Sequence, residues 1–194
     1  LVLDGVVYVG SADNQFYAVD AAKGERRWQF ATGDKVLGAA NHFRAADGDG
    51  SLAGDLYDVG NLRILHLTFS QPNWASLLTA NYPAEISIPA TLAMAGAVLA
   101  NVGVRYKGDT SYRMATTRKK SFNVDIDFMA PGQRLLGMKA LNLNNAYSDA
   151  SFLREALHNN FAAQYIPSPR AAFVVLYVNG VNYGVYVNSQ QENR

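Results

Sequence analysis

The sequence predicts an α+β fold in which one main helix packs on an antiparallel sheet, with a small all-β unit before it. Apolar and polar residues alternate over short stretches along most of the chain, which is typical of half-buried strands. Residues 149–165 carry the one long helical pattern. Asn179-Gly180 separates two apolar runs, which is a strong short-range signal for a β-hairpin.

Composition limits the classes of protein to which the chain can belong. With 194 residues, it has room for one full domain and a fragment. Because 49% of the residues are hydrophobic and 17% are charged, we expect a buried core and not a disordered chain. A net charge of +1 gives no long-range attraction to nucleic acid or to an anionic membrane. Cysteine is absent, which excludes disulfides, thiol catalysis and thiolate metal sites.

Two features indicate how the chain relates to a longer protein and to membranes. It begins at Leu1, without Met or a basic leader, so we expect it to be cut from a longer protein and to be truncated at both ends. The uncharged stretch from Ile86 to Val104 is long enough to span a bilayer, but its apolar residues alternate. We interpret it as two strands and expect no membrane span.

Residues 1–35 contain three short predicted strands, at Val6–Val9, Phe16–Val19 and Glu25–Ala31, separated by turn residues. The amino-acid sequence of this part, "VVYVGSADNQFYAVDAAKGERRWQFATGD", resembles one repeat of the quinoprotein-type (PQQ-like) β-propellers. The resemblance implies a single propeller blade fragment, whereas quinone binding or quinone-dependent dehydrogenation would need further repeats. The alternative is an unrelated β-meander.

Residues 36–60 are predicted to be a linker, because they are rich in Gly, Ala and Asp and have no periodicity. Five oxygen-bearing side chains in this stretch echo the spacing of a calcium loop, but Leu52 stands where such a loop requires glycine. We therefore favour a solvated linker over a metal site. These side chains are Asp47, Asp49, Ser51, Asp55 and Asp58.

The second domain is predicted to span residues 61–194. We expect a strand through Leu65–Phe69, a short helix opened by Pro72-Asn73, and two strands on either side of Gly96. The clearest alternation is that of Phe122, Val124, Ile126 and Phe128, and Leu141 with Leu143 marks a further strand.

The main helix is predicted from Asp149 to Tyr165, capped by Ser148 or Asp149 and stopped by Pro167 and Pro169. A hairpin of Phe173–Val178 and Val181–Val187 should follow it. The helix presents one apolar stripe that we expect to face the sheet. The stripe consists of Phe152, Leu153, Ala156, Leu157 and Phe161.

The order of these elements is similar to the small lobe of a protein kinase. Four stretches, "NVGVRYKGDTS", "KKSFNVDID", "LNLNNAYSDASFLREAL" and "LYVNGVNYGVYV", resemble the CotH family, the spore-coat-protein-H-like atypical protein kinases. The resemblance covers about residues 56–194 and implies the kinase-like N-terminal lobe, with the C-terminal lobe missing. It also implies transfer of phosphate from ATP to Ser of secreted or cell-surface bacterial proteins, with Mg²⁺ or Mn²⁺.

In such a lobe a lysine meets the phosphates and a helix glutamate holds that lysine. Period two places Lys120 on the face of Phe122 and Val124, so Lys120 is the first candidate and Lys119 the second. Glu155 is the candidate helix partner. The alternatives are that both lysines are solvated edge charges and that Glu155 lies on an ordinary polar face.

A small-residue loop follows the strand that carries Arg105, and its backbone N–H groups could approach phosphate. The carboxylate of Asp109, where the family often has Asn, would repel phosphate unless it turns away or meets metal. A generic Gly-Asp turn is the alternative. The loop candidates are Arg105, Gly108, Thr110 and Ser111.

No metal site is predicted within the chain. Asp127 in "DFM" precedes the helix, whereas kinase metal ligands belong to the large lobe, so Asp125 and Asp127 are interpreted as solvent-face residues. His42, His66 and His158 have no ligand spacing. We therefore expect no catalytic residue in the chain and no phosphate transfer by the 194 residues alone. The alternative function is a non-catalytic surface, adhesion or assembly module.

Overall fold

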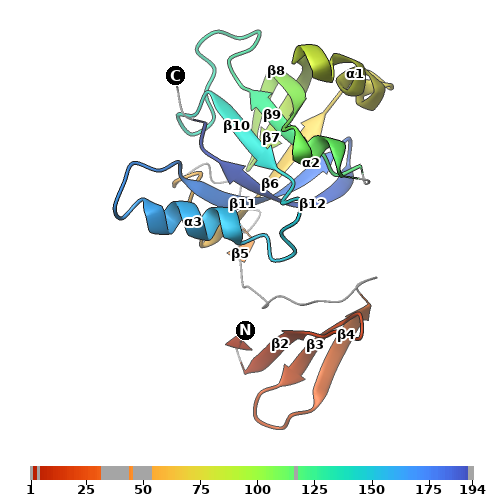
Figure 1. The fold of residues 1–194 in the computed structure, drawn as a ribbon, viewed down its shortest axis with the longest axis vertical. Coiled ribbons are helices and arrows are strands. Elements are labelled where there is room, and N and C mark those ends of the chain that lie inside the picture. The colour runs from red at the N-terminus through yellow and green to blue at the C-terminus, as the bar shows by residue number, and fades with distance from the viewer. Residues whose placement is uncertain (1, 4, 32–43, 46–53, 116–117, 192–194) are drawn as a thin grey trace. The chain divides into compact units, whose positions relative to one another are not determined.

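The computed structural model describes residues 2–3, 5–31, 44–45, 54–115 and 118–191 (Figure 1). The chain divides into two compact units, one of Leu1–Phe43 with Ser148–Ser151 and one of Arg44–Tyr147 with Phe152–Arg194. Each unit is described separately.

The first unit is a four-stranded antiparallel sheet in the order β1-β2-β3-β4. The three expected strands are present, and a two-residue strand pairs with the first of them. The sheet is an antiparallel meander. It is not shown to be a propeller blade, because a propeller consists of several such sheets arranged around a channel and the structure describes one. Its strands are β1 (Val2–Leu3), β2 (Val6–Gly10), β3 (Gln15–Asp20) and β4 (Arg26–Ala31).

The second unit is a closed barrel of seven strands, in the cyclic order β6-β7-β8-β9-β10-β12-β11. Neighbours pair antiparallel except β11 and β6, whose parallel pairing from Val174↔Arg63 to Val178↔Leu67 closes the barrel. The strands are β6 (Asn61–Thr68), β7 (Ile88–Met94), β8 (Ala97–Lys107), β9 (Ser121–Asp125), β10 (Ala140–Asn144), β11 (Ala171–Val178) and β12 (Val181–Ser189).

Short elements accompany the barrel. The strand β5 (Arg44–Ala45) pairs in parallel with β6. The helices α1 and α2 lie near β8, and α3 lies against β11 and β12 (Figure 1). The helical elements are α1 (Trp74–Asn81), a 3-10 turn at Tyr82–Ala84, α2 (Thr110–Arg113) and α3 (Arg154–Ala162).

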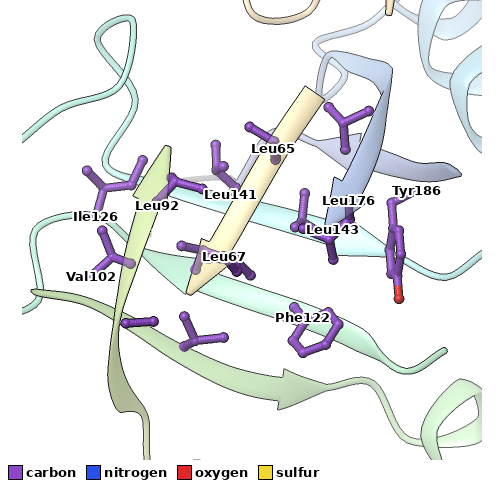
Figure 2. Packing of buried hydrophobic residues seen from close by; sticks show 14 of the residues in the cluster. Leu65, Leu67, Leu92, Val102, Phe122, Ile126, Leu141, Leu143, Leu176 and Tyr186 are labelled. Carbon is purple, nitrogen blue, oxygen red and sulfur yellow. The ribbon is translucent and has the colours of Figure 1, made fainter. Parts of the chain in front are cut away.

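The barrel interior is filled by the apolar residues of the alternating strands. Figure 2 shows Leu65 and Leu67 of β6 together with Phe122 of β9, Leu143 of β10 and Tyr186 of β12, and all five are buried. Because side chains alternate along a strand, the residues between these positions face outward. The outer face of β8, β9 and β10 is therefore where polar side chains gather.

Closure of the sheet corrects the predicted architecture. We expected an open antiparallel sheet with one main helix, in the manner of a kinase small lobe, but the unit is mostly β and its helices are short. The predicted hairpin is confirmed: Asn179 and Gly180 both have positive φ, and Nδ2 and Oδ1 of Asn179 bond the backbone of Phe69.

The main helix also differs from its prediction. It begins at Arg154 and not near Asp149, because Phe152 has a φ of 62° and breaks the helical path. The expected cap at Ser148 or Asp149 is wrong, since the N-cap is Leu153, without a side-chain cap hydrogen bond. The predicted stripe is rotated outward: Leu157 and Phe161 are 61% and 63% exposed, whereas Ala156 is buried.

The predicted linker lies largely outside the described residues, as do Asp47, Asp49 and Ser51. Asp55 pairs with Arg170 (2.7 Å), and Asp58 accepts a hydrogen bond from the N–H of Gly60. Of the helices that the structure describes, none has the length and apolarity to cross a membrane. The uncharged stretch forms β7 and β8, as predicted.

Candidate functional site

A row of polar side chains crosses the outside of the barrel. Arg105 on β8 lies opposite Asn123 on β9, and Asn123 lies opposite Asn142 on β10. Directly opposed residues share a face of the sheet. Lys107 and Asn144 belong to the next row of this face. We call Arg105, Lys107, Asn123, Asn142 and Asn144 the polar face.

Amide groups hold one end of the polar face. Nδ2 of Asn123 donates to Oδ1 of Asn142 (3.0 Å) and to Oε1 of Gln191 (3.0 Å), just beyond β12. Asn123 is 8% exposed, so these hydrogen bonds satisfy a nearly buried amide. Asn123 and Gln191 also line a cavity, so their amides lie beside it.

A lysine and a glutamate meet the other end of the polar face. Nζ of Lys107 donates to Oδ1 of Asn144 (3.1 Å), and Nδ2 of Asn144 donates to Oε1 of Glu155 on α3 (2.7 Å). Burial lowers the pKa of Lys107, the negative charge of Glu155 acts to raise it, and the positive charge of Arg105 lowers it further. The Lys107–Asn144–Glu155 chain therefore holds a half-buried cation in a fixed position.

Two cavities open on the polar face. The first, of about 610 Å³, is lined by Lys107, Gly108 and Tyr82 among others, and we call it the Gly108 pocket. The second, of about 640 Å³, is lined by Asn123 and Gln191 among others, and we call it the Asn123 pocket. Arg105 lines both, so one ligand could extend from one pocket into the other. An ion pair with Glu85 (3.1 Å) holds Arg105.

The loop after β8 depends on Gly108. This residue has a φ of 84°, and a Cβ there would meet Oγ of Ser111, so glycine suits both the backbone and the space. The Tyr82 hydroxyl donates to the Gly108 carbonyl, and its ring stacks on Tyr112 with centroids 3.5 Å apart. Tyrosine contacts thus anchor a loop that borders the Gly108 pocket.

Asp109 was expected to repel an anion unless it turned away or met a metal. Its carboxylate pairs with the Arg113 guanidinium (2.6 Å), one turn further on. Both side chains are largely exposed, so the pair is weak in water. Arg113 nevertheless brings a positive charge to the same pocket, which offsets the charge of Asp109.

Lys120 does not lie beside Glu155 in the described contacts. It precedes β9, and its ammonium donates to the carbonyls of Tyr112 (2.8 Å) and Ala115 (2.5 Å), so it supports the segment after Gly108. Lys119 donates to the carbonyl of Val185 (2.6 Å). Of the two remaining loop candidates, Thr110 begins α2, and the carbonyl of Ser111 accepts from Nδ2 of Asn145 (3.4 Å).

The structure therefore brings Arg105, Gly108 and Glu155 to one region, together with side chains that the sequence reasoning missed. Lys107 was not predicted as a site residue, because Lys107-Gly108 was interpreted as the start of a loop. Asn144 closes "LNLN", where two amides alternate with buried leucines. Uncharged amides on the outer face of a strand were a signal for a partly buried polar surface.

Carboxylates do not form a metal centre among the described residues. No group of three or more His, Asp or Glu side chains there could hold a metal ion. Asp127 pairs with Arg134 (2.9 Å), and hydrogen bonding by the N–H of Gly132 holds its pKa below the usual value. Asp125 also lines the Asn123 pocket, so these two residues border a cavity.

A family model matches the part of the chain that contains the polar face. Residues 104–193 match the family model described as CotH kinase protein. They are a CotH kinase domain fragment. The matched residues run from the end of β8 through β12 and contain Arg105, Lys107, Asn144 and Glu155. No curated protein matches the sequence, and no comparison supports a PQQ-like repeat in residues 1–35.

Proposed function

We propose that the CotH kinase fragment binds ATP on its polar face, as the nucleotide-binding part of a protein kinase that phosphorylates Ser. The observation that carries this proposal is the Lys107–Asn144–Glu155 chain, which fixes a cation beside the Gly108 pocket. Phosphoryl transfer depends mainly on positioned positive charge, and the ammonium of Lys107, held by Asn144 and Glu155, supplies such a charge.

The triphosphate occupies the Gly108 pocket. Arg105, Lys107 and Arg113 place three positive charges around it, against the two carboxylates of Glu85 and Asp109. The loop at Gly108 lets backbone N–H groups approach a phosphate oxygen. Thr110 and Ser111 add small hydroxyl residues to the same loop. Lys120 supports this loop indirectly, because its ammonium donates hydrogen bonds to the carbonyls of Tyr112 and Ala115.

The nucleobase occupies the Asn123 pocket. A heterocycle with its own donors and acceptors suits a cavity bordered by the amides of Asn123 and Gln191. Arg105 lies at the junction of the two pockets and contacts the phosphate nearest the sugar. One nucleotide then spans the polar face from amides to cations.

Among the described residues, no group of His, Asp or Glu side chains fits a divalent metal. We expect Mg²⁺ or Mn²⁺ to arrive bound to ATP. The protein acceptor is a Ser side chain of a secreted or cell-surface bacterial protein. Both expectations follow from the family and not from the geometry.

Nitrogen-15 NMR of the 194-residue chain, titrated with ATP and Mg²⁺, tests the proposal. The expected result is a set of saturable shift changes at Gly108 and along the polar face, with none in the first unit. Inorganic triphosphate should reproduce the changes at Gly108 but not those at Asn123. Saturable changes confined to other surfaces, or none at millimolar ATP, would reject the polar face as the ATP site.

A further inference from the structure

The ammonium of Lys119 lies between a barrel strand and the start of α3. Nζ donates to the carbonyl of Val185 on β12 (2.6 Å) and lies 5.0 Å from the ring centroid of Tyr186. It also lies 4.3 Å from the ring centroid of Phe152, two residues before α3 begins. One charged group therefore contacts two elements that are separate in the sequence.

The start of α3 has an unusual backbone conformation and no side-chain cap. Phe152 has a φ of 62°, a conformation that is unfavourable for a residue with a bulky side chain. The N-cap residue, Leu153, offers no side-chain cap hydrogen bond. A backbone held in a sparsely populated conformation persists where surrounding contacts fix it. The contact with Lys119 is such a contact.

The segment that carries Lys119 is itself attached to the end of β10. Nδ2 of Asn145 donates to the carbonyl of Lys119 (2.9 Å), and the N–H of Asn145 donates to Oγ of Ser121 (3.0 Å). Asn145 follows Asn144, the residue that bridges Lys107 and Glu155. The backbone of Lys119 is therefore fixed close to that bridge.

We infer that Lys119 is a positioning residue, which fixes the start of α3 and thereby places the carboxylate of Glu155 at Asn144. Glu155 lies in the first turn of α3, and a helical turn is rigid, so fixing Phe152 limits where Glu155 can reach. This role differs from the direct phosphate contact for which Lys119 was the second candidate. Its effect on ATP rests on the proposed function, whereas its effect on α3 does not.

Hydrogen exchange of α3 amides in the 194-residue chain tests the structural part. Lys119→Met keeps an apolar side chain of similar length between the rings but removes the charge. Loss of one cation–π contact predicts roughly 2- to 30-fold faster exchange at α3. Amides of β6 and β7, which Lys119 does not contact in the described hydrogen bonds and ring contacts, should be unchanged. Lys119→Arg should restore slow exchange, and the exposed Lys23→Met is the control.

Phe152→Leu removes the ring from the other side of the contact. If the two side chains act together, Lys119→Met combined with Phe152→Leu should speed exchange at α3 no more than the stronger single change. Unchanged exchange at α3 in Lys119→Met, or a double variant in which the effects simply multiply, would overturn the positioning role.

ATP affinity then separates this inference from the proposed function. Lys119→Met and Glu155→Gln should weaken ATP binding, and the double variant should bind no more weakly than the weaker-binding single variant. If wild-type protein does not bind ATP while Lys119→Met still loosens α3, the proposed function fails and the positioning role stands. If Lys119→Met weakens binding with α3 exchange unchanged, Lys119 contacts the nucleotide directly and the inference is wrong.

Discussion

Lys107 and Glu155 are joined through a single side chain, that of Asn144. Its Oδ1 accepts a hydrogen bond from Nζ of Lys107 at 3.1 Å, and its Nδ2 donates to Oε1 of Glu155 at 2.7 Å. A carboxamide can do this because it offers an acceptor and a donor on neighbouring atoms. The cation and the anion are thus linked across β10 without direct contact.

The glycine at position 108 should be required for both backbone and steric reasons. Gly108→Ala places a Cβ at a φ of 84° and against Oγ of Ser111. We expect a loss of about 1–2 kcal/mol in the free energy of unfolding, measured by urea denaturation.

Gly132→Ala is the matched control, because Gly132 has a similar φ of 86° and open space around the added Cβ. It should cost less than Gly108→Ala, and Ser111→Ala should recover the difference. Equal costs at the two positions would show that the contact with Ser111 carries no energy.

Asn188 should be replaceable by an apolar residue with a gain in stability. It is fully buried on β12, and neither its Nδ2 nor its Oδ1 has a hydrogen-bond partner among the described residues. Because an unsatisfied buried amide costs about 1–3 kcal/mol, Asn188→Leu should raise the free energy of unfolding by about 1 kcal/mol. If urea denaturation instead shows a lower free energy of unfolding for Asn188→Leu, the amide holds an ordered water molecule and the prediction is wrong.

The fold could be predicted from the sequence where signals are local. Asn179-Gly180 specified the last hairpin because both central residues must adopt positive φ, which these residue types tolerate. Closure of the barrel could not be predicted in this way. It depends on the parallel pairing of β6 with β11, whose residues are far apart in the chain and carry no mutual local signal.

The candidate site was also predicted only where its residues lie in a local sequence pattern. Arg105 and Gly108 were found from a loop pattern, and Glu155 from its place on a helix. The orientation of that helix was wrong, because its larger apolar residues, Leu157 and Phe161, face solvent. Lys107 was missed because its significance comes from Asn144, on a strand that the local pattern could not place beside it.

Stability should depend on pH in two opposite ways at alkaline pH. Burial lowers the pKa of Lys119 to about 8, and burial also lowers that of Lys107. Between about pH 8 and the ordinary lysine value of 10.5, the unfolded chain holds protons that the folded chain has lost. The free energy of unfolding should therefore rise with pH in this range.

Tyrosines act in the opposite direction. Burial raises the pKa of Tyr57 and of Tyr106 to about 12, and also raises that of Tyr186. Above the ordinary value of 10.0, the unfolded chain loses these protons first, so stability should fall as pH rises further. Urea denaturation across alkaline pH should show a maximum near pH 10. Lys119→Met should flatten the rise, and an unchanged rise would contradict the assignment to Lys119.

Calorimetric titration of ATP and Mg²⁺ into wild-type, Lys107→Met and Lys120→Met proteins tests the central claim most directly. A hydrogen bond from a charged group contributes about 1.5–3 kcal/mol, so Lys107→Met should weaken ATP binding by roughly 10- to 150-fold. Lys120→Met, once its folding is verified by circular dichroism, should weaken binding less, because its ammonium bonds the carbonyls of Tyr112 and Ala115. Unchanged affinity in Lys107→Met, with a large loss in Lys120→Met, would contradict the account.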